Sequence, residues 1–231
     1  PSWCEETTKI MSLQTIVDNA TYATIYRKKI AGQSISRSGR LLTSEIVSAV
    51  PYQFTVGMHS GLQYSTNRGL TEDLNALDVT EEATIDIGTT NTSLAYITAY
   101  QGVLTPVQIG QITVTSASAS SLVLNTTSVT GGPSGNAFKK GDYLILDNNY
   151  RYPYQATADV TYSGTSITVP LSRNFIPQDS YTVAGKGIAV GSAVTWKVKM
   201  INKPKYSVMP HDILQFDDRF EFIEFIRKED V

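Results

Sequence analysis

Two histidines are the first candidates for acid–base chemistry, because imidazole is the side chain that most often moves protons near neutral pH. His59 lies in the segment 57–61, which glycine bounds at both ends, and His211 stands between Pro210 and Asp212. Neither context matches a nucleophile elbow, and an Asp directly beside a His on a strand points to the opposite face. We interpret both histidines as turn or surface residues and expect no enzymatic activity.

Oxygen-rich turns are the next candidates, since Asp and Asn oxygens bind calcium. Residues 147–149 and 217–218 form such turns, but neither has the spacing of a calcium loop, and hairpins commonly contain them. One cysteine and two distant histidines provide no zinc spacing, and neither type of glycine-rich phosphate loop occurs. The carboxylate pairs at 81–82 and at Glu221 with Glu224 are expected on solvated strand faces. No metal, cofactor or catalytic residue is therefore expected.

Tyrosine is unusually frequent, with 13 copies, three of them within residues 150–154. Its side chain combines an apolar body with a polar tip and is enriched at protein interfaces. It also stacks on the apolar faces of sugars, and ordinary core filling is a further alternative. Pro153 favours an extended loop at this point, so we predict contacts with other protein chains. The predicted contact residues are Tyr150, Tyr152, Tyr154, Phe220, Phe222 and Phe225.

The charge of the chain is low and nearly balanced. It has 19 basic and 21 acidic residues, a net charge of −2, and its 17% of charged residues is below the roughly 25% of typical soluble domains. A weakly charged, hydroxyl-rich surface suits a protein whose faces are covered by neighbours. Nucleic-acid binding needs a concentrated positive field. The basic cluster at residues 27–29 is expected on a solvated strand edge, so no nucleic-acid partner is expected.

The single cysteine, Cys4, excludes an intramolecular disulfide, which fits assembly in a reducing cytoplasm. No apolar run approaches the roughly 20 residues of a membrane span, and we expect none. The first residues do not have the basic and then apolar pattern of a signal peptide. Met11 reads as a natural beginning, so residues 1–10 are interpreted as an extension.

The dominant periodicity is two, which is the period of a β-strand. It is clearest where Trp196, Val198 and Met200 alternate with Lys197 and Lys199, so the three apolar side chains should face a core. Similar runs are rich in Thr, Val, Ile and Tyr, which favour strands. These runs predict further strands at residues 22–30, 52–56, 83–87, 94–100, 112–115, 122–125, 143–146, 154–162, 166–171, 213–216 and 220–226.

Helix signals are few. Ser12 is placed to cap a short helix over residues 13–19, and Thr71 with two following acidic residues favours another helix that runs to about residue 77. The expected fold class is therefore mainly β: a β-barrel or sandwich with an inserted small β domain and one or two short helices.

The expected division into domains follows a change in composition. Residues 103–183 are poor in charge and rich in Ser, Thr and Gly, whereas the flanking parts contain most charges and the helix signals. We predict that residues 12–102 and 188–228 form one β-barrel-like domain and that residues 103–183 form a β domain inserted into it. A single continuous β structure is the alternative.

Three stretches together carry a family resemblance. They are residues 33–43 with 50–59 and 64–68, residues 138–145 with 152–160, and residues 204–212 with 220–226. With them, most of the chain resembles virion structural proteins of marine tailed phages, especially those of T4-like cyanophages. The stretch around 138–145 is similar to small β domains inserted in phage capsid and tail proteins.

This resemblance implies a tail or baseplate subunit that forms rings through a β-barrel, in a virion assembled in the host cytoplasm. The expected partners are copies of the chain and other virion proteins, with host surface glycan as a further candidate. Capsid decoration and a carbohydrate-binding attachment module are the alternatives to this function. A hydrolase would instead need a cleft with converging carboxylates whose pKa values are shifted.

Overall fold

The computed structural model describes residues 13–27, 31–35, 41–45, 50–59, 61–76, 82–147 and 149–230. It is mainly β, with a curled half-barrel sheet and a few short helices, which confirms the predicted fold class. None of the described helices combines the length and the apolar character that crossing a membrane requires. Ser12 and residues 1–10 lie outside the described residues.

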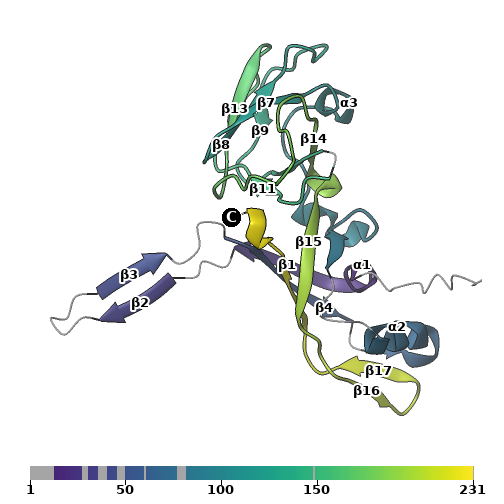
Figure 1. The fold of residues 1–231 in the computed structure, drawn as a ribbon. Coiled ribbons are helices and arrows are strands. Elements are labelled where there is room, and N and C mark those ends of the chain that lie inside the picture. Colours follow the sequence, from purple (N-terminus) through teal and green to yellow (C-terminus); the bar gives the residue numbers. More distant parts are fainter. Residues whose placement is uncertain are drawn as a thin grey trace, which may run out of the picture.

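One antiparallel sheet of five strands organises the lower half of the molecule in Figure 1. Its strands come from both ends of the described chain, so that distant segments lie side by side. In spatial order they are β1 (Ala20–Arg27), β4 (Tyr52–Met58), β18 (Phe220–Glu224), β15 (Thr195–Asn202) and β6 (Ala83–Asp86).

A second group of strands gathers at the upper end of the molecule in Figure 1. It forms three small antiparallel sheets. They are β11 (Tyr154–Gln155) with β10 (Tyr143–Leu146) and β14 (Ile188–Val190), β12 (Val160–Thr161) with β9 (Asn136–Phe138), and β13 (Ser166–Pro170) with β8 (Ser121–Asn125) and β7 (Thr113–Ala117).

Two smaller sheets complete the strands. One combines β16 (Tyr206–Met209), β17 (Ile213–Phe216) and β5 (Leu62–Gln63), and helix α2 (Tyr64–Ala76) follows it directly. The other consists of β2 (Ala31–Ile35) and β3 (Leu41–Glu45), which pair only with each other among the described strands.

The remaining helices are short. They are α1 (Gln14–Asp18), α3 (Pro106–Ile109), and the 3-10 helices η1 (Thr92–Ile97), η2 (Gly191–Ala193) and η3 (Lys228–Asp230).

Strand pairing keeps residues 113–190 apart from the other described strands. The boundary differs from the predicted one, because Ile188–Val190, assigned from the sequence to the first domain, pairs with β10 instead. The two groups nevertheless share one continuous core. The rings of Tyr143 and Trp196 meet edge to face across the boundary, with centroids 5.6 Å apart.

The alternation in β15 is confirmed. Trp196, Val198 and Met200 are buried, whereas Lys197 and Lys199 lie on the other face. Burying such apolar side chains stabilises the fold by roughly 1.5–3 kcal/mol each.

Three local predictions were wrong. The single strand expected at residues 154–162 is instead two short strands, β11 and β12, in different sheets. Residues 94–100 are not a strand: the chain forms η1 there, because Gly88 lacks a side chain and so lets the backbone of Ala95 approach closely. The predicted helix start at Thr71 is also wrong, since α2 begins at Tyr64. A contact distant in sequence decides this start.

Asp212 provides the N-terminal cap of α2. Its carboxylate accepts hydrogen bonds from the Ser65 backbone N–H, at 2.8 Å, and from the Ser65 hydroxyl, while its carbonyl accepts one from the Tyr64 N–H at 2.9 Å. Asp212 and His211 hold positive φ angles of 63° and 67° in the turn between β16 and β17. The strained turn thus brings Asp212 to the start of α2, although Asp212 lies 147 residues from Ser65 in the sequence.

We expect Asp212→Ala to lower the free energy of unfolding by about 1 kcal/mol, because it removes the cap from two donors. Asp212→Asn keeps one acceptor oxygen and tolerates positive φ, so its loss should be smaller. Urea denaturation followed by circular dichroism measures both. Equal stability of Asp212→Ala and the wild type would contradict this role.

Candidate functional site

The tyrosines predicted as contact residues lie inside the chain. Tyr150, Tyr152 and Tyr154 are 4%, 0% and 0% exposed. The hydroxyls of Tyr150 and Tyr154 lie 2.6 Å apart, and the Tyr150 hydroxyl donates to the carbonyl of Ile176 at 2.6 Å. The Ile176 N–H in turn donates to the Tyr154 hydroxyl at 2.9 Å. The polar tips of these rings are therefore satisfied by their own chain.

The phenylalanines of β18 are also largely internal. Phe220 and Phe222 are fully buried, and Phe225 is half-buried beneath the Lys199 ammonium, which lies 4.1 Å from the ring centroid. Five of the six predicted contact rings thus fill the interior of the subunit. This corrects the prediction, because a buried ring offers no surface to a partner.

A buried ion pair connects the two groups of strands. Arg173 and Glu224 both have 0% side-chain exposure. The guanidinium donates to both carboxylate oxygens, at 2.6 Å to Oε1, and also to the carbonyls of Val50 at 3.1 Å and Pro153 at 2.7 Å. Glu224 Oε2 accepts a further bond from the Tyr52 N–H at 3.0 Å. The pair is hydrogen-bonded on almost every side.

Two aromatic rings enclose the Arg173 guanidinium, whose central carbon lies 4.9 Å from the ring centroid of Tyr52 and 5.3 Å from that of Tyr154. Burial by itself disfavours the charged guanidinium, but the Glu224 carboxylate beside it raises the pKa of Arg173 above its ordinary value. Arg173 is therefore charged, and its contact with Glu224 holds the two strand groups together.

The carboxylate prediction for this strand is corrected by the same contact. Glu221 and Glu224 do not share a solvated face: Glu221 is half-buried, whereas Glu224 is fully paired in the core. Side chains alternate between the two faces of β18, so Glu224 lies on the same buried face as Phe220 and Phe222. This alternation in the sequence indicated that the Glu224 carboxylate is buried and therefore paired. Nothing local identifies its partner Arg173.

Additional contacts fix the loop around residues 150–154 and its neighbours to other parts of the chain. Arg151 forms an ion pair with Glu82. The Tyr152 hydroxyl donates to Asp230 Oδ2, and Asp230 Oδ1 accepts from the Asp179 N–H at 3.1 Å. The extended loop around residues 150–154 thus docks on its own chain.

The two histidines lie in separate elements. His59 is exposed just after β4, and His211 is exposed in the turn between β16 and β17. Neither imidazole hydrogen-bonds to another residue that the structure describes. Among these residues there is also no group of three or more His, Cys, Asp or Glu side chains that could hold a metal ion.

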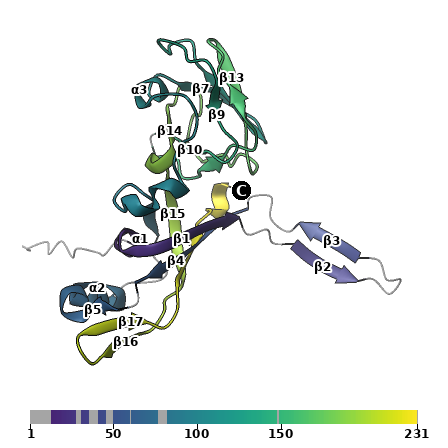
Figure 2. The same cartoon turned by 180° about the vertical axis from the view of Figure 1, so that it is seen from behind.

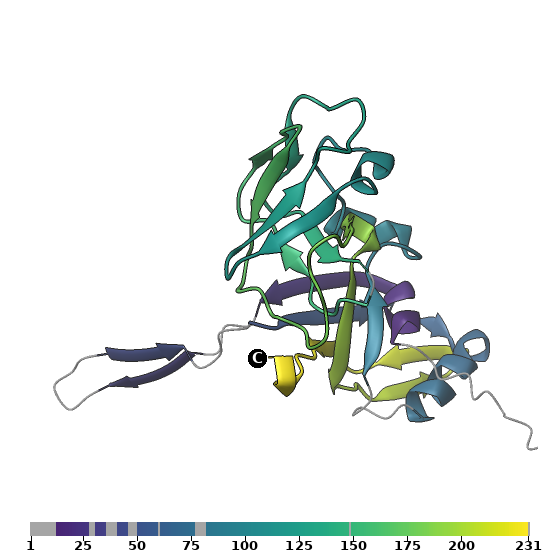
Figure 3. The ribbon, with the colours of Figure 1, turned by 45° about the horizontal axis from the view of Figure 1, so that its top comes forward.

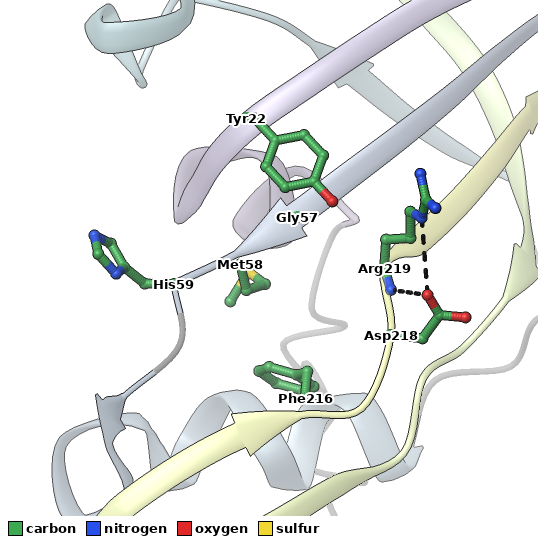
Figure 4. Close-up of a pocket in the computed structure, with 7 residues that line it drawn as sticks. All are labelled: Tyr22, Gly57, Met58, His59, Phe216, Asp218 and Arg219. Atoms are coloured by element: carbon green, nitrogen blue, oxygen red, sulfur yellow. Dashed lines mark hydrogen bonds and ion pairs between the residues drawn. The ribbon is translucent and has the colours of Figure 1, made fainter.

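A surface hollow lies at the end of β4 that carries Gly57 (Figure 4). Its volume is about 350 Å³, and it combines aromatic and polar side chains. The lining residues are Tyr22, Gly57, Met58, His59, Phe216, Asp218 and Arg219.

A second, apolar hollow of about 580 Å³ lies between α3, η1 and β14. Tyr100, Leu104 and Ile109 line one part of it, and Ile188–Val190 line another. Nothing in the described residues covers it.

The hairpin β2–β3 extends away from the rest of the molecule (Figures 2 and 3). We refer to residues 28–45 as the arm. It leaves the body at Arg27, which pairs directly with Tyr52 in the five-stranded sheet, so the chain departs and returns at neighbouring positions. The arm is therefore an excursion from an otherwise regular β1–β4 pair.

We expect Glu224→Ala to lower the free energy of unfolding by about 3–5 kcal/mol, because it leaves the Arg173 charge buried without a partner. Combined with Arg173→Met, the loss should be smaller than the sum of the two single losses. Urea denaturation of the four proteins measures the coupling. The control is Arg219→Ala, from the exposed pair with Asp218, where the loss should stay below about 1 kcal/mol. Similar losses at both pairs would contradict the role of the buried one.

The buried tyrosines predict an alkaline limit to stability. Burial raises the pKa of Tyr143 to about 12 from an unfolded value near 10. The contribution of such a group is complete below pH 10 and is lost as pH rises through 12. The free energy of unfolding should therefore fall over this range, and less steeply in Tyr143→Phe. Denaturation at several pH values between 9 and 12 tests this, and identical slopes would contradict it.

Comparison with known proteins adds no relative to this description. No protein-family model matches the chain, and no curated protein matches it. Its function therefore has to be inferred from its own residues and geometry.

Proposed function

We propose that this chain is a non-enzymatic structural subunit of a tailed-virus particle, in its tail or baseplate, and that it assembles with copies of itself into a symmetric oligomer. The arm is the observation that carries the assembly part of the proposal. Its placement in the virion rests on the sequence resemblance to phage structural proteins.

The arm supports assembly because a two-stranded hairpin is marginal in water by itself. Strands β2 and β3 pair only with each other among the described strands, so each presents an open edge. Open edges and uncovered faces are surfaces that a neighbouring protein chain can pair with or cover. A partner chain would supply the strand pairing and the covered face that the body of the same chain does not supply.

Charge favours the body of another copy as that partner. The arm contains four of the 19 basic residues and one of the 21 acidic residues, so it has a net charge of +3 and the remainder of the chain −5. Two arms repel each other, whereas an arm and a body attract. Contact between different surfaces of two copies is heterologous, and such contacts close into rings when the rotation allows.

The subunit interior supports a structural role as well. At the centre of the molecule, Arg173 and Glu224 form a buried ion pair, and Glu224 Oε2 also accepts a hydrogen bond from the Tyr52 N–H. Their contact joins the two strand groups, which suits a structural role.

Removing the arm tests the proposal. Because Arg27 and Tyr52 are paired neighbours, residues 29–48 can be replaced by a short Gly-Ser linker without breaking the β1–β4 pair. We expect the wild type to sediment as an oligomer and the armless variant as a folded monomer with an unchanged near-ultraviolet circular dichroism spectrum. A wild type that sediments only as a monomer, or an armless variant that keeps its oligomeric state, would contradict the proposal.

Neutralising the arm is a finer test. Arg37→Gln with Arg40→Gln should weaken self-association at least several-fold and reduce its dependence on salt. The matched control is Lys139→Gln with Lys140→Gln, which removes two exposed cations from the body. Sedimentation velocity at two salt concentrations compares the pairs. Localisation by cryo-electron microscopy of phage particles distinguishes tail or baseplate from capsid, and absence from the particle would reject the virion assignment.

A further inference from the structure

The hollow of Figure 4 contains an aromatic platform. The Tyr22 ring lies across Gly57, its cross-strand partner. A Cβ atom at position 57 would fall 1.9 Å from Tyr22 Cε1, so only glycine allows the ring to rest on the backbone. Tyr22 remains 46% exposed. One face of the ring is therefore supported by the sheet, and the other is open to the hollow.

Two charged residues lie on one side of this platform. Asp218 and Arg219, in the turn between β17 and β18, form an exposed ion pair with 3.8 Å between Oδ1 and Nε. Asp218 Oδ1 also accepts from the Arg219 N–H at 2.8 Å. Asp218 Oδ2 and the terminal guanidinium nitrogens of Arg219 have no partner among the described residues. The His59 side chain points away from Tyr22 in Figure 4.

We propose that this hollow binds a neutral saccharide ring. A pyranose has an apolar C–H face that can stack on the open face of Tyr22, and hydroxyls at its edge that both donate and accept. Asp218 accepts and Arg219 donates, so adjacent hydroxyls find both kinds of partner. The volume of about 350 Å³ lies within the usual range of ligand pockets, roughly 300–1,000 Å³.

Charge disfavours the main competing ligand classes. An anionic ligand such as a phosphate ester would meet the Asp218 carboxylate, and a cationic ligand would meet the Arg219 guanidinium. A neutral, hydroxyl-rich ligand uses both groups without repulsion from either one. An uncharged sugar is therefore the class that this combination suits best.

The hollow is independent of the arm. Tyr22 pairs with Gly57 near one end of β4, whereas the arm leaves the sheet where Arg27 pairs with Tyr52 at the other end. An oligomer formed through the arm leaves this end of the strand as a separate feature. The site adds attachment to a glycan to the structural role and does not depend on it.

Saturation-transfer difference NMR on the full chain tests the inference, with the methyl glycosides of glucose, galactose, mannose and N-acetylglucosamine as probes. We expect saturation of the C–H protons of at least one glycoside. Tyr22→Ala removes the platform and Gly57→Ala displaces the ring, so each should lower the affinity at least tenfold. Asp218→Ala should lower it several-fold.

The matched control is Tyr26→Ala. Tyr26 lies on the same strand and is 42% exposed, but it does not line the hollow, so its removal should leave binding unchanged. Near-ultraviolet circular dichroism confirms that each variant is folded. No transfer to any of the four glycosides, or an equal loss in Tyr26→Ala and Tyr22→Ala, would overturn the inference. Neither result would alter the sedimentation of the armless variant, so the two proposals fail separately.

Discussion

Arg173 and Glu224 lose all contact with water in the folded chain, and removing two such charges from water costs several kcal/mol for each ion. The structure offsets this cost only because the geometry is nearly complete: two charge-assisted bonds within the pair, two backbone carbonyls and one backbone N–H. These hydrogen-bonding partners come from both groups of strands. The pair can therefore form only when the two groups meet in one register, which makes it a determinant of how they fit together.

Some aromatic residues pack around this ion pair in the core, and others lie on the surface. Tyr52 and Tyr154 enclose the guanidinium, and Tyr143 joins them to Trp196 in the core. Tyr22, by contrast, lies on the outward side of the same sheet. One residue type thus fills the seam between the strand groups and also forms an open platform, because a sheet has two faces and the fold covers them unequally.

Two surface features remain after the interior has been accounted for. The sequence of the arm has a net positive charge and the remainder of the chain a net negative one, and the hollow contains a supported aromatic ring beside an exposed ion pair. They lie toward opposite ends of the β1–β4 pair. A subunit built in this way can assemble through one end of the pair and meet a ligand at the other.

Local sequence determined which residues lie on a common strand face. The alternation at residues 196–200 predicted both the strand and its buried side chains, since the period of two follows from backbone geometry alone. It did not determine which face a distant segment covers. Tyr152 and Glu224 were expected outside and lie in the core, and α2 begins where Asp212 caps it, because burial and capping depend on groups that only the tertiary structure brings together.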